Sequence, residues 1–426
     1  MLKISLYLPL FFCISLFSQG IEYAKHVVSE LSSEEYSGRA YLEKGDQKAA
    51  EFIKMEFVKY GIKPLGKNFF QPFIISVNTF PGKIESSLNG TLLKPGADFL
   101  VDPSSPTVKD KFIINSFSRA DLLNQDTLKK IINSSNGNAI LIDETDTLTF
   151  SKEELTKIDQ IINTIKYAAE LKNSLTIIYT NKKLTWSISP WQAKKSVITV
   201  LSKGIQSKDY TQIEINIEAK FLKKYSTQNI CGIIEGTICR DSFLVLTAHY
   251  DHLGKMGKET IFPGANDNAS GVAMLLNLSR HFALNPPKYS IVFIAFSAEE
   301  LGLLGSEYFT KSPLIDLQKI KFLINFDLAG TGEEGIKVVN STIFQSEFQR
   351  LKQINLENNY LNAIEPRGEA CISDHCFFYK QNVPSFYMYT LGGVKAYHDI
   401  YDKAETLPMT QFVNYSELMK AFITSF

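Results

Sequence analysis

The spacing of apolar side chains divides the chain into three segments after its first twenty residues. Between residues 21 and 67 they recur at helical intervals in two stretches, 23–31 and 50–58. Between about 68 and 222 most apolar runs are short and β-like, and one amphipathic helix is expected at about 152–171. The strands of this second segment are expected at 111–115, 138–142, 175–179, 196–201 and 212–222.

The third segment, residues 223–426, alternates apolar strands with helices. Strands are expected at 242–247, 290–296, 322–326 and 383–389, and helices at 268–283, 301–309, 346–358 and 411–424. Continuously apolar strands separated by helices are typical of a mostly parallel sheet covered on both faces. The pattern therefore predicts an α/β fold with a mostly parallel, mixed sheet. The helices of 21–67 should pack on this domain, because alone they cannot bury their apolar faces.

The segment 68–222 is interpreted as a smaller, β-rich inserted domain. It contains no histidine, no cysteine and no acidic cluster with the spacing of metal ligands. We therefore assign it no chemistry and expect it to serve as a lid, a spacer or a wall of the substrate path.

The N-terminus has the pattern of a signal peptide over residues 1–20. Lys3 precedes an apolar run from 4 to 17, which is too short to span a bilayer, and Ser18-Gln19-Gly20 offers small residues for cleavage. Cys13 lacks the small residues that a lipid-attachment site wants before its cysteine. The chain is thus expected to be exported, to the periplasm or the exterior, and no later stretch is long and apolar enough to cross a membrane.

Composition and cysteine count narrow the picture further. The chain is 44% hydrophobic and 21% charged, with 45 basic and 45 acidic residues, which argues against a nucleic-acid-binding protein. Four cysteines remain after processing, too few and too irregularly spaced for a thiolate zinc site. In an exported protein their even number is compatible with two disulfides, and sequence-local pairing favours Cys231–Cys239 and Cys371–Cys376.

Candidate metal ligands stand just beyond the predicted strands. In open α/β sheets, ligands bind in the crevice outside the carboxyl ends of the strands. Taken singly, each residue has an ordinary interpretation: a hydrogen-bonded histidine, a helix cap or a solvated helix start. Grouped at one sheet edge, imidazoles and carboxylates indicate divalent metals. The residues that follow strands are His249, Asp251, Glu299, Glu300 and Asp327, and Asp267 stands at the mouth of a helix.

These residues lie in motifs that carry a family resemblance. The motifs are Ala248-His-Tyr-Asp-His252, Gly264-Ala-Asn-Asp-Asn-Ala-Ser-Gly271, Ser297-Ala-Glu-Glu-Leu-Gly302, Asn325-Phe-Asp327, Ser373-Asp-His375 and Tyr397-His398. Together they resemble the co-catalytic di-zinc aminopeptidases, a family that also includes glutamate-carboxypeptidase-like enzymes, glutaminyl cyclases and inactive transferrin-receptor-like relatives. The resemblance covers residues 229–402, and the insert is similar, more weakly, to the protease-associated domain of many members.

The resemblance implies a site for two zinc ions per chain. Asp267 would bridge the ions, His249 and Asp327 would complete one site, and Glu300 and His398 the other. Each site would keep a position open for water and substrate. Asp251 would accept the second ring N–H of His249 and fix its tautomer, and Asp402 would have a comparable supporting role.

The resemblance also implies roles for the reacting groups. Glu299 would be the general base that takes a proton from a metal-activated water and returns it to the leaving amine. Tyr397 would either donate its hydroxyl to the oxyanion or be a packed aromatic. Asp374 and His375 match a motif near the substrate pocket. Asp399 departs from the family, which more often has a small hydroxyl residue there, and it adds a negative charge near the second metal.

The expected function is that of an aminopeptidase acting on peptide substrates, because five ligands and a base are all present. A carboxypeptidase or dipeptidase of the same family differs in pocket chemistry, which the motifs do not specify. A glutaminyl cyclase would work with one zinc and should lack the full ligand set. A receptor-like relative should show substituted ligands, and none is substituted here.

Overall fold

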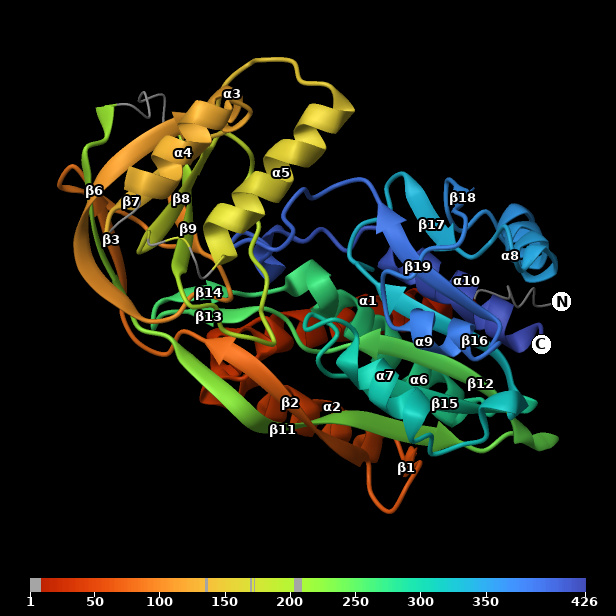
Figure 1. Cartoon of the computed structure of the whole chain (residues 1–426). Helices are drawn as coiled ribbons and strands as arrows, with labels where there is room; N and C mark the ends of the chain where they lie inside the picture. The colour runs from red at the N-terminus through yellow and green to blue at the C-terminus, as the bar shows by residue number, and fades with distance from the viewer. Residues whose placement is uncertain (1–8, 135–136, 169–170, 172, 203–208) are drawn as a thin grey trace, which may run out of the picture.

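The computed structural model describes residues 9–134, 137–168, 171, 173–202 and 209–426. Within these residues the chain forms a larger body around a nine-stranded sheet and a smaller, β-rich body around an eight-stranded sheet (Figure 1). The first eight residues of the expected signal peptide lie outside the described residues, and the remainder is the start of helix α1 (Pro9–Leu31). No described helix combines the length and apolar character needed to cross a membrane.

The larger sheet has the order β1-β11-β15-β12-β16-β19-β17-β18, with β2 paired to β11. Its four central strands, β15, β12, β16 and β19, run parallel to one another, so their carboxyl ends meet at one edge. β11 and β17 flank them in the antiparallel direction. The fold class predicted for this domain is confirmed. The strands are β1 (Lys63–Pro64), β2 (Phe70–Thr79), β11 (Lys220–Ile234), β12 (Cys239–His249), β15 (Tyr289–Phe296), β16 (Ile320–Asp327), β17 (Gly335–Val339), β18 (Ile364–Pro366) and β19 (Ser385–Leu391).

Helices cover both faces of this sheet because successive strand residues point to opposite sides. In β12, Leu244 and Leu246 enter one apolar cluster and Val245 enters another. The first cluster lies under α1, α2 (Gly45–Lys59), α6 (Gly271–Leu284), α8 (Gln345–Asn358) and α10 (Phe412–Thr424). The second lies under α7 (Leu304–Lys311) and α9 (His375–Lys380). The two N-terminal helices thus bury their apolar faces against the larger sheet's helices.

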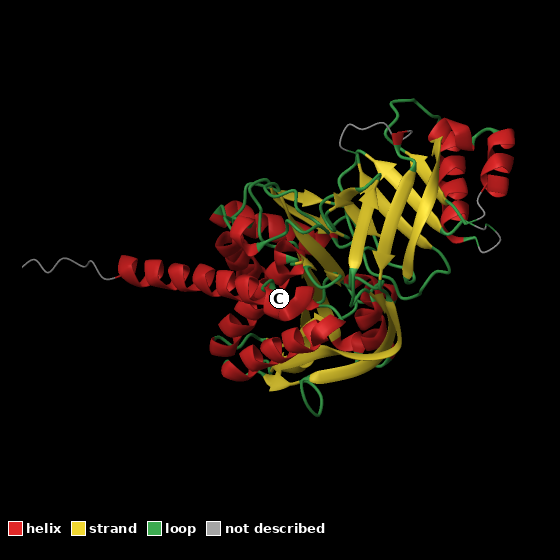
Figure 2. Cartoon of the chain, turned by 90° about the vertical axis from the view of Figure 1, so that its left-hand side faces the viewer, coloured by secondary structure: helices red, strands yellow, loops and turns green. Residues whose placement is uncertain are grey.

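The smaller sheet has the order β4-β3-β10-β6-β7-β8-β9-β5. Figure 2 shows its helices on the outer side, away from the larger body. β6 to β9 are parallel, and β10, β3, β4 and β5 extend the sheet through antiparallel pairings. The elements are β3 (Ile84–Leu88), β4 (Thr91–Leu93), β5 (Phe99–Val101), β6 (Val108–Ser118), α3 (Arg119–Leu122), α4 (Gln125–Ser134), β7 (Ala139–Asp143), α5 (Lys152–Tyr167), β8 (Leu175–Thr180), β9 (Ser196–Leu201) and β10 (Gln212–Ile217).

Two features join the bodies. β2 and β11 form a long antiparallel ribbon that enters and leaves the insert while belonging to the larger sheet. The hairpin of β13 (Gly254–Met256) and β14 (Thr260–Phe262) reaches from the larger body into the insert's apolar core, where Leu253, Met256 and Phe262 are buried. The insert and the metal-motif region therefore share one core.

One predicted disulfide is wrong and the other is present. Cys371 and Cys376 are bonded, whereas Cys231 and Cys239 are free. Cys231 lies on β11 and Cys239 on β12, and β15 runs between these strands. Two strand spacings amount to about 10 Å, beyond the reach of a disulfide. The prediction relied on closeness in sequence. The chain leaves β11 and enters β12, which is not the neighbour of β11 but the next strand but one in the sheet.

Candidate metal centre

The carboxyl ends of the parallel strands bring the predicted ligands together. His249 is the last residue of β12 and Asp327 the last of β16. Glu299 and Glu300 follow the end of β15 in a turn that precedes α7. Asp267 lies in a π-helical turn, Ala265–Ser270, so α6 begins at Gly271 and not at the predicted residue 268. These turns aim the side chains over the sheet edge, where a regular helix would not.

The first group consists of His249, Asp267 and Asp327, all buried. His249 Nε2 lies 3.5 Å from Asp267 Oδ1 and 3.6 Å from Asp327 Oδ1. Tyr387 donates its hydroxyl to Asp327 Oδ2 at 3.2 Å. Asp327 Oδ1 has no hydrogen-bond partner among the described residues, although buried oxygens normally have one.

The second group shares Asp267 with the first and also contains Glu300, with two histidines beside it. His398 Nε2 lies 3.0 Å from Asp267 Oδ2 and 3.4 Å from Glu300 Oε2. A second imidazole, His252, lies 2.8 Å from Glu300 Oε1 through Nδ1 and 4.0 Å from Asp267 Oδ1. Glu300 thus has one histidine on each carboxylate oxygen. Asp267 has Oδ1 toward His249 and Oδ2 toward His398, which is the arrangement needed to bridge two ions.

Asp402 and Asp251 hold the main chain that carries the ligands. Asp402 accepts from the backbone N–H of Asn266 at 2.8 Å and of Asp267 at 3.0 Å. Asp251 accepts from the N–H of Glu299 at 3.1 Å and of Glu300 at 3.3 Å.

The group beside His249 Nδ1 differs from the expectation. It is the main-chain oxygen of Asp251, at 3.1 Å, while the Asp251 carboxylate is 3.9 Å away. That carboxylate is already occupied by the two amides of the Glu299–Glu300 turn. The carbonyl can fix the tautomer of His249 equally well.

Arg39 lies beneath the Asp267 turn and is completely buried. Its guanidinium donates only to backbone oxygens, and each nitrogen has at least one acceptor. The acceptors are Leu31, Tyr250, Pro263, Gly264 and Asp267, at 2.7 to 3.1 Å. Arg39 therefore ties the N-terminal segment to the metal turn and places a fixed positive charge behind the carboxylates.

The carboxylates crowd one another strongly. Burial, followed by neighbouring carboxylates, raises the pKa of Glu299 and of Glu300 well above its usual range. Burial also raises the pKa of Asp402 to about 7. For His249, burial lowers the pKa, but Glu299 and Asp327 outweigh it, so the pKa is raised.

This donor set fits divalent metal ions. Carboxylate oxygens and imidazole nitrogens are ligands that zinc accepts, and cations would relieve the repulsion among the crowded carboxylates. The unpartnered Asp327 Oδ1 points to the same conclusion. Within the described residues, both groupings that could hold a metal lie at this sheet edge.

A cavity of about 280 Å³ opens over the two groups. Glu299, Tyr397, Tyr387 and Ile372 line it together with the ligands of both groups. The ring of Tyr397 stacks on that of His398, with centroids 4.0 Å apart, and 46% of the residue is exposed.

Asp374 and His375, predicted near the substrate pocket, do not line this cavity. His375 lies one layer behind, stacked on Tyr387, and burial lowers its pKa to about 4. Burial raises the pKa of Asp374 to about 7. Both lie within the Cys371–Cys376 disulfide loop, from which only Ile372 lines the cavity.

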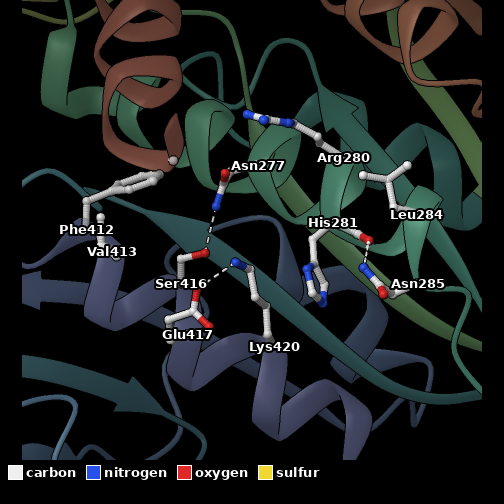
Figure 3. Close-up of a pocket in the computed structure, with 11 residues that line it drawn as sticks. Asn277, Arg280, His281, Leu284, Asn285, Phe412, Val413, Ser416, Glu417 and Lys420 are labelled. Carbon is white, nitrogen blue, oxygen red and sulfur yellow. Dashed lines mark hydrogen bonds and ion pairs between the residues drawn. The ribbon is translucent and has the colours of Figure 1, made fainter. Parts of the chain in front are cut away.

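A cavity of about 370 Å³ lies between α6 and α10, and Figure 3 shows its lining. There Asn277 donates to Ser416 and Lys420 pairs with Glu417. These four polar groups bond in pairs, and neither metal-capable grouping lies there. We therefore place the chemistry at the strand-end cavity.

The sequence reasoning missed four supporting residues: Arg39, Lys183, His252 and Tyr387. Arg39 belongs to Ser37-Gly38-Arg39, a sequence typical of a turn, which gives no sign of its distant partners. His252 stands in a recognised motif, directly after Asp251 and three residues after His249, and this position is the one available signal. Lys183 and Tyr387 reach the site through pairings that only the fold creates.

Crowded imidazoles and carboxylates at the carboxyl ends of a parallel sheet define a candidate site for divalent metal ions. The family model that this sequence matches is that of Peptidase family M28, over residues 229–423. The family resemblance noted from the motifs is thereby confirmed.

The matches to curated relatives extend over only part of each relative's length. The chain is similar to aminopeptidase YwaD of Bacillus subtilis, with 31% identity over 261 residues, 59% of this chain and 52% of that protein. It is also similar to a probable zinc metalloprotease of Pyricularia oryzae, with 36% identity over 113 residues, 26% and 22% of the two chains. The chain thus spans about half the length of the first relative and about a fifth of the second.

Solved structures share the fold across both bodies. BSAP, a zinc aminopeptidase from Bacillus subtilis, aligns with a TM-score of 0.68 at 21% identity, over 95% of this chain and 94% of that one. A Peptidase M28 precursor from Shewanella amazonensis aligns with a TM-score of 0.69 at 15% identity, over 96% and 95%. At these identities the likeness shows the fold, including the inserted β-rich body.

Proposed function

We propose that this protein is a two-zinc aminopeptidase that removes N-terminal residues from peptides. One observation carries the proposal: Asp267 gives one oxygen to each of two ligand groups, and Glu299 lines the same cavity outside both. The relatives named as an aminopeptidase and a zinc metalloprotease support the same class of activity.

In this proposal His249, Asp267 and Asp327 hold one ion, and Asp267, Glu300 and His398 hold the other. His252 also lies near the second group, but it is fully buried and does not line the cavity, whereas His398 does. Burial lowers the pKa of His252 well below its usual range, so it is a neutral imidazole that donates Nδ1–H to Glu300 Oε1. His252 therefore orients Glu300. When bound, two such ions would lower the pKa of a water and polarise the substrate carbonyl.

Glu299 acts as the general base. Its carboxylate takes a proton from the attacking water and delivers it to the amine that leaves, as the bond between the first and second residues breaks.

Tyr397 is proposed as the donor to the oxyanion. Its ring is held by the stack on His398, next to the second group, and nearly half of the residue is exposed in the cavity wall. A hydroxyl fixed beside the ligands can donate to the oxygen on which negative charge develops. His375 and Tyr387 instead position Asp327, through the stack and the hydroxyl bond described above.

We also propose that the protein is exported. The charged and apolar pattern of residues 1–20 supports this, and so does the disulfide Cys371–Cys376, because disulfides persist in oxidising compartments. The experiment is to compare the mass of the protein in periplasmic or culture fractions with that of the full chain. A full-length chain found only in the cytosol would contradict export.

The activity is tested on matched aminoacyl amides with free and blocked N-termini, with and without a chelator. The proposal expects chelator-sensitive cleavage of the free-amine substrates alone. Cleavage of the blocked substrates, or of C-terminal residues, would instead identify a carboxypeptidase of the same family. Bound zinc without turnover on any substrate would overturn the aminopeptidase assignment.

A further inference from the structure

The inserted domain holds the loop that carries His398. The backbone N–H of Trp186, in the insert, donates to the carbonyl of His398 at 2.8 Å. In return, His398 Nδ1 lies 3.0 Å from the carbonyl oxygen of Trp186. Because Nε2 faces Asp267 and Glu300, Nδ1 is the nitrogen that donates to Trp186. A carbonyl in this place selects the tautomer and fixes the ring plane of a metal-binding histidine.

Lys183, three residues before Trp186, contacts residues on either side of His398. Its ammonium donates to the carbonyls of Lys395 at 2.6 Å and of Tyr397 at 3.2 Å. It also pairs with Asp399 Oδ2 at 2.7 Å. All three donors of this ammonium thus reach one short loop.

Asp399 explains why a cation is needed there. Only 5% of its side chain is exposed, and a buried carboxylate without a partner is costly. Its other oxygen accepts from the N–H of Tyr401 at 2.8 Å. The extra negative charge that sets this sequence apart from its family is therefore balanced by a lysine of the insert.

The loop depends on such contacts for its shape. His398 has a φ of +53°, in the left-handed region that a residue with a side chain adopts only when its surroundings hold it there. Trp186 provides a rigid support, since its indole donates to the carbonyl of Val101 at 2.7 Å and stacks on Phe262 with centroids 4.6 Å apart. Phe262 belongs to the hairpin that precedes the Asp267 turn. The same aromatic pair thus supports both the His398 loop and the Asp267 turn.

We propose that residues 183–186 of the insert are part of the second metal site, with Lys183 and the Trp186 main chain as positioning groups for His398. This inference rests on the proposed function, in which His398 is a ligand. The contacts described for His249 and Asp327 come from Asp251 and Tyr387, in the larger body. Lys183, whose contacts all lie in the His398 loop, should therefore control the affinity of one metal and leave the other unchanged.

The test is a calorimetric titration of the full-length, metal-free protein with Zn²⁺. Lys183→Met removes the ammonium while keeping an unbranched side chain, and it should weaken one of two binding steps about ten- to a hundredfold. Lys183→Arg should restore most of that loss. Lys182→Met is the matched control and should change neither step. Lys182 is the adjacent lysine, its side chain is 69% exposed, and among the described residues its ammonium pairs with Glu144 alone. His398→Ala identifies which step belongs to the second group.

The outcomes distinguish a failure of the Lys183 positioning role from a failure of the proposed two-zinc function. Unchanged affinities in Lys183→Met, or equal losses at both steps, would overturn the positioning role and leave a plain contact between the two bodies. A wild-type chain that binds fewer than two ions would overturn the proposed function instead. If Lys183→Met fails to fold, Lys183→Met/Asp399→Asn removes the buried charge together with its partner. The inference expects that double variant to show the same selective loss, and two normal steps would overturn it.

Discussion

At the scale of single residues, Arg39 and the carboxylates form one electrostatic unit. Burial lowers the pKa of Arg39 to about 10, and Asp267 and Asp402 act in the opposite direction. The guanidinium remains charged at neutral pH. The guanidinium donates to the main-chain carbonyls of the Asp267 turn and so lies close to the carboxylates. The same side chain therefore fixes the shape of the turn and supplies a positive charge next to it.

Arg39→Lys tests this unit. An ammonium has three donors, so at least two of the five carbonyls that Arg39 serves lose their partner, at a cost of about 1–3 kcal/mol each. We expect a fall of several degrees in the thermal midpoint of the metal-free protein. Arg240→Lys, at an exposed position, is the control and should leave the midpoint in place. Equal midpoints for the two variants would show that Arg39 is not a structural tie.

Glu299→Gln tests the chemistry at the same scale. The amide cannot take a proton from water, so turnover should fall by about 10²- to 10⁴-fold. Glu299 lies outside both ligand groups, so zinc content, measured by atomic absorption, should stay at the parent value. Unchanged turnover would remove Glu299 as the base, and lost zinc would make it a ligand.

Single residues also show how far sequence could reach. His249, Glu299 and Asp327 could be predicted because each follows an apolar strand, and parallel strands end at one edge. Arg39 could not, because its acceptors lie more than 200 residues further along the chain, apart from Leu31. No local pattern marks a residue whose partners are backbone oxygens of another element.

At the scale of elements, α2 is fastened to β11 by a buried carboxylate. Asp46, in the first turn of α2, accepts from the hydroxyls of Tyr225 at 2.7 Å and Thr227 at 2.8 Å. It has no exposed surface, and burial raises its pKa to about 7. The folded state therefore favours the protonated form of this residue.

Asp46→Asn should flatten part of the pH dependence of stability. Because the folded pKa exceeds the unfolded value near 4, the folded state binds more protons between about pH 4 and 7, and its stability falls as pH rises through that window. This contribution is at most about 4 kcal/mol and is absent from the asparagine variant. The measurement is urea unfolding of both proteins at pH 5 and pH 8. The variant should gain stability relative to the parent at pH 8, and parallel curves would contradict the raised pKa.

Helices and strands were predicted well where the local sequence pattern determines the element, and poorly where pairing with a distant strand determines it. The strands at 290–296 and 196–201 coincide almost residue for residue with β15 and β9, because continuous apolar runs leave little choice. β2 was missed, since its polar and apolar residues alternate without a strong signal and its partner β11 lies about 150 residues away. The predicted Cys231–Cys239 disulfide was wrong for the same reason. Strands that follow one another in sequence need not be neighbours in the sheet, and here β15 lies between β11 and β12.

At the scale of the whole molecule, the metals should contribute to stability as well as to catalysis. Ions that bind the folded chain alone stabilise it by about 2.7 kcal/mol at a free concentration one hundred times Kd. They would also neutralise the crowded carboxylates at the junction of the two bodies. Chelator should therefore lower the thermal midpoint, and zinc should restore it. Asp267→Asn, which weakens both sites, should lose most of that zinc response; a response of parental size would contradict the bridging assignment.

The burial of Arg39 also has a consequence for the order of events during synthesis. Its acceptor on Tyr250 is translated 211 residues later, and the acceptor on Asp267 later still. At about 5–20 residues per second, the ribosome needs roughly 10–40 seconds to cover that interval. Throughout it, a guanidinium destined for the interior must remain in solvent. The segment around Arg39 is thus translated well before the turn that it supports, and it reaches its final packing only after that turn has been made.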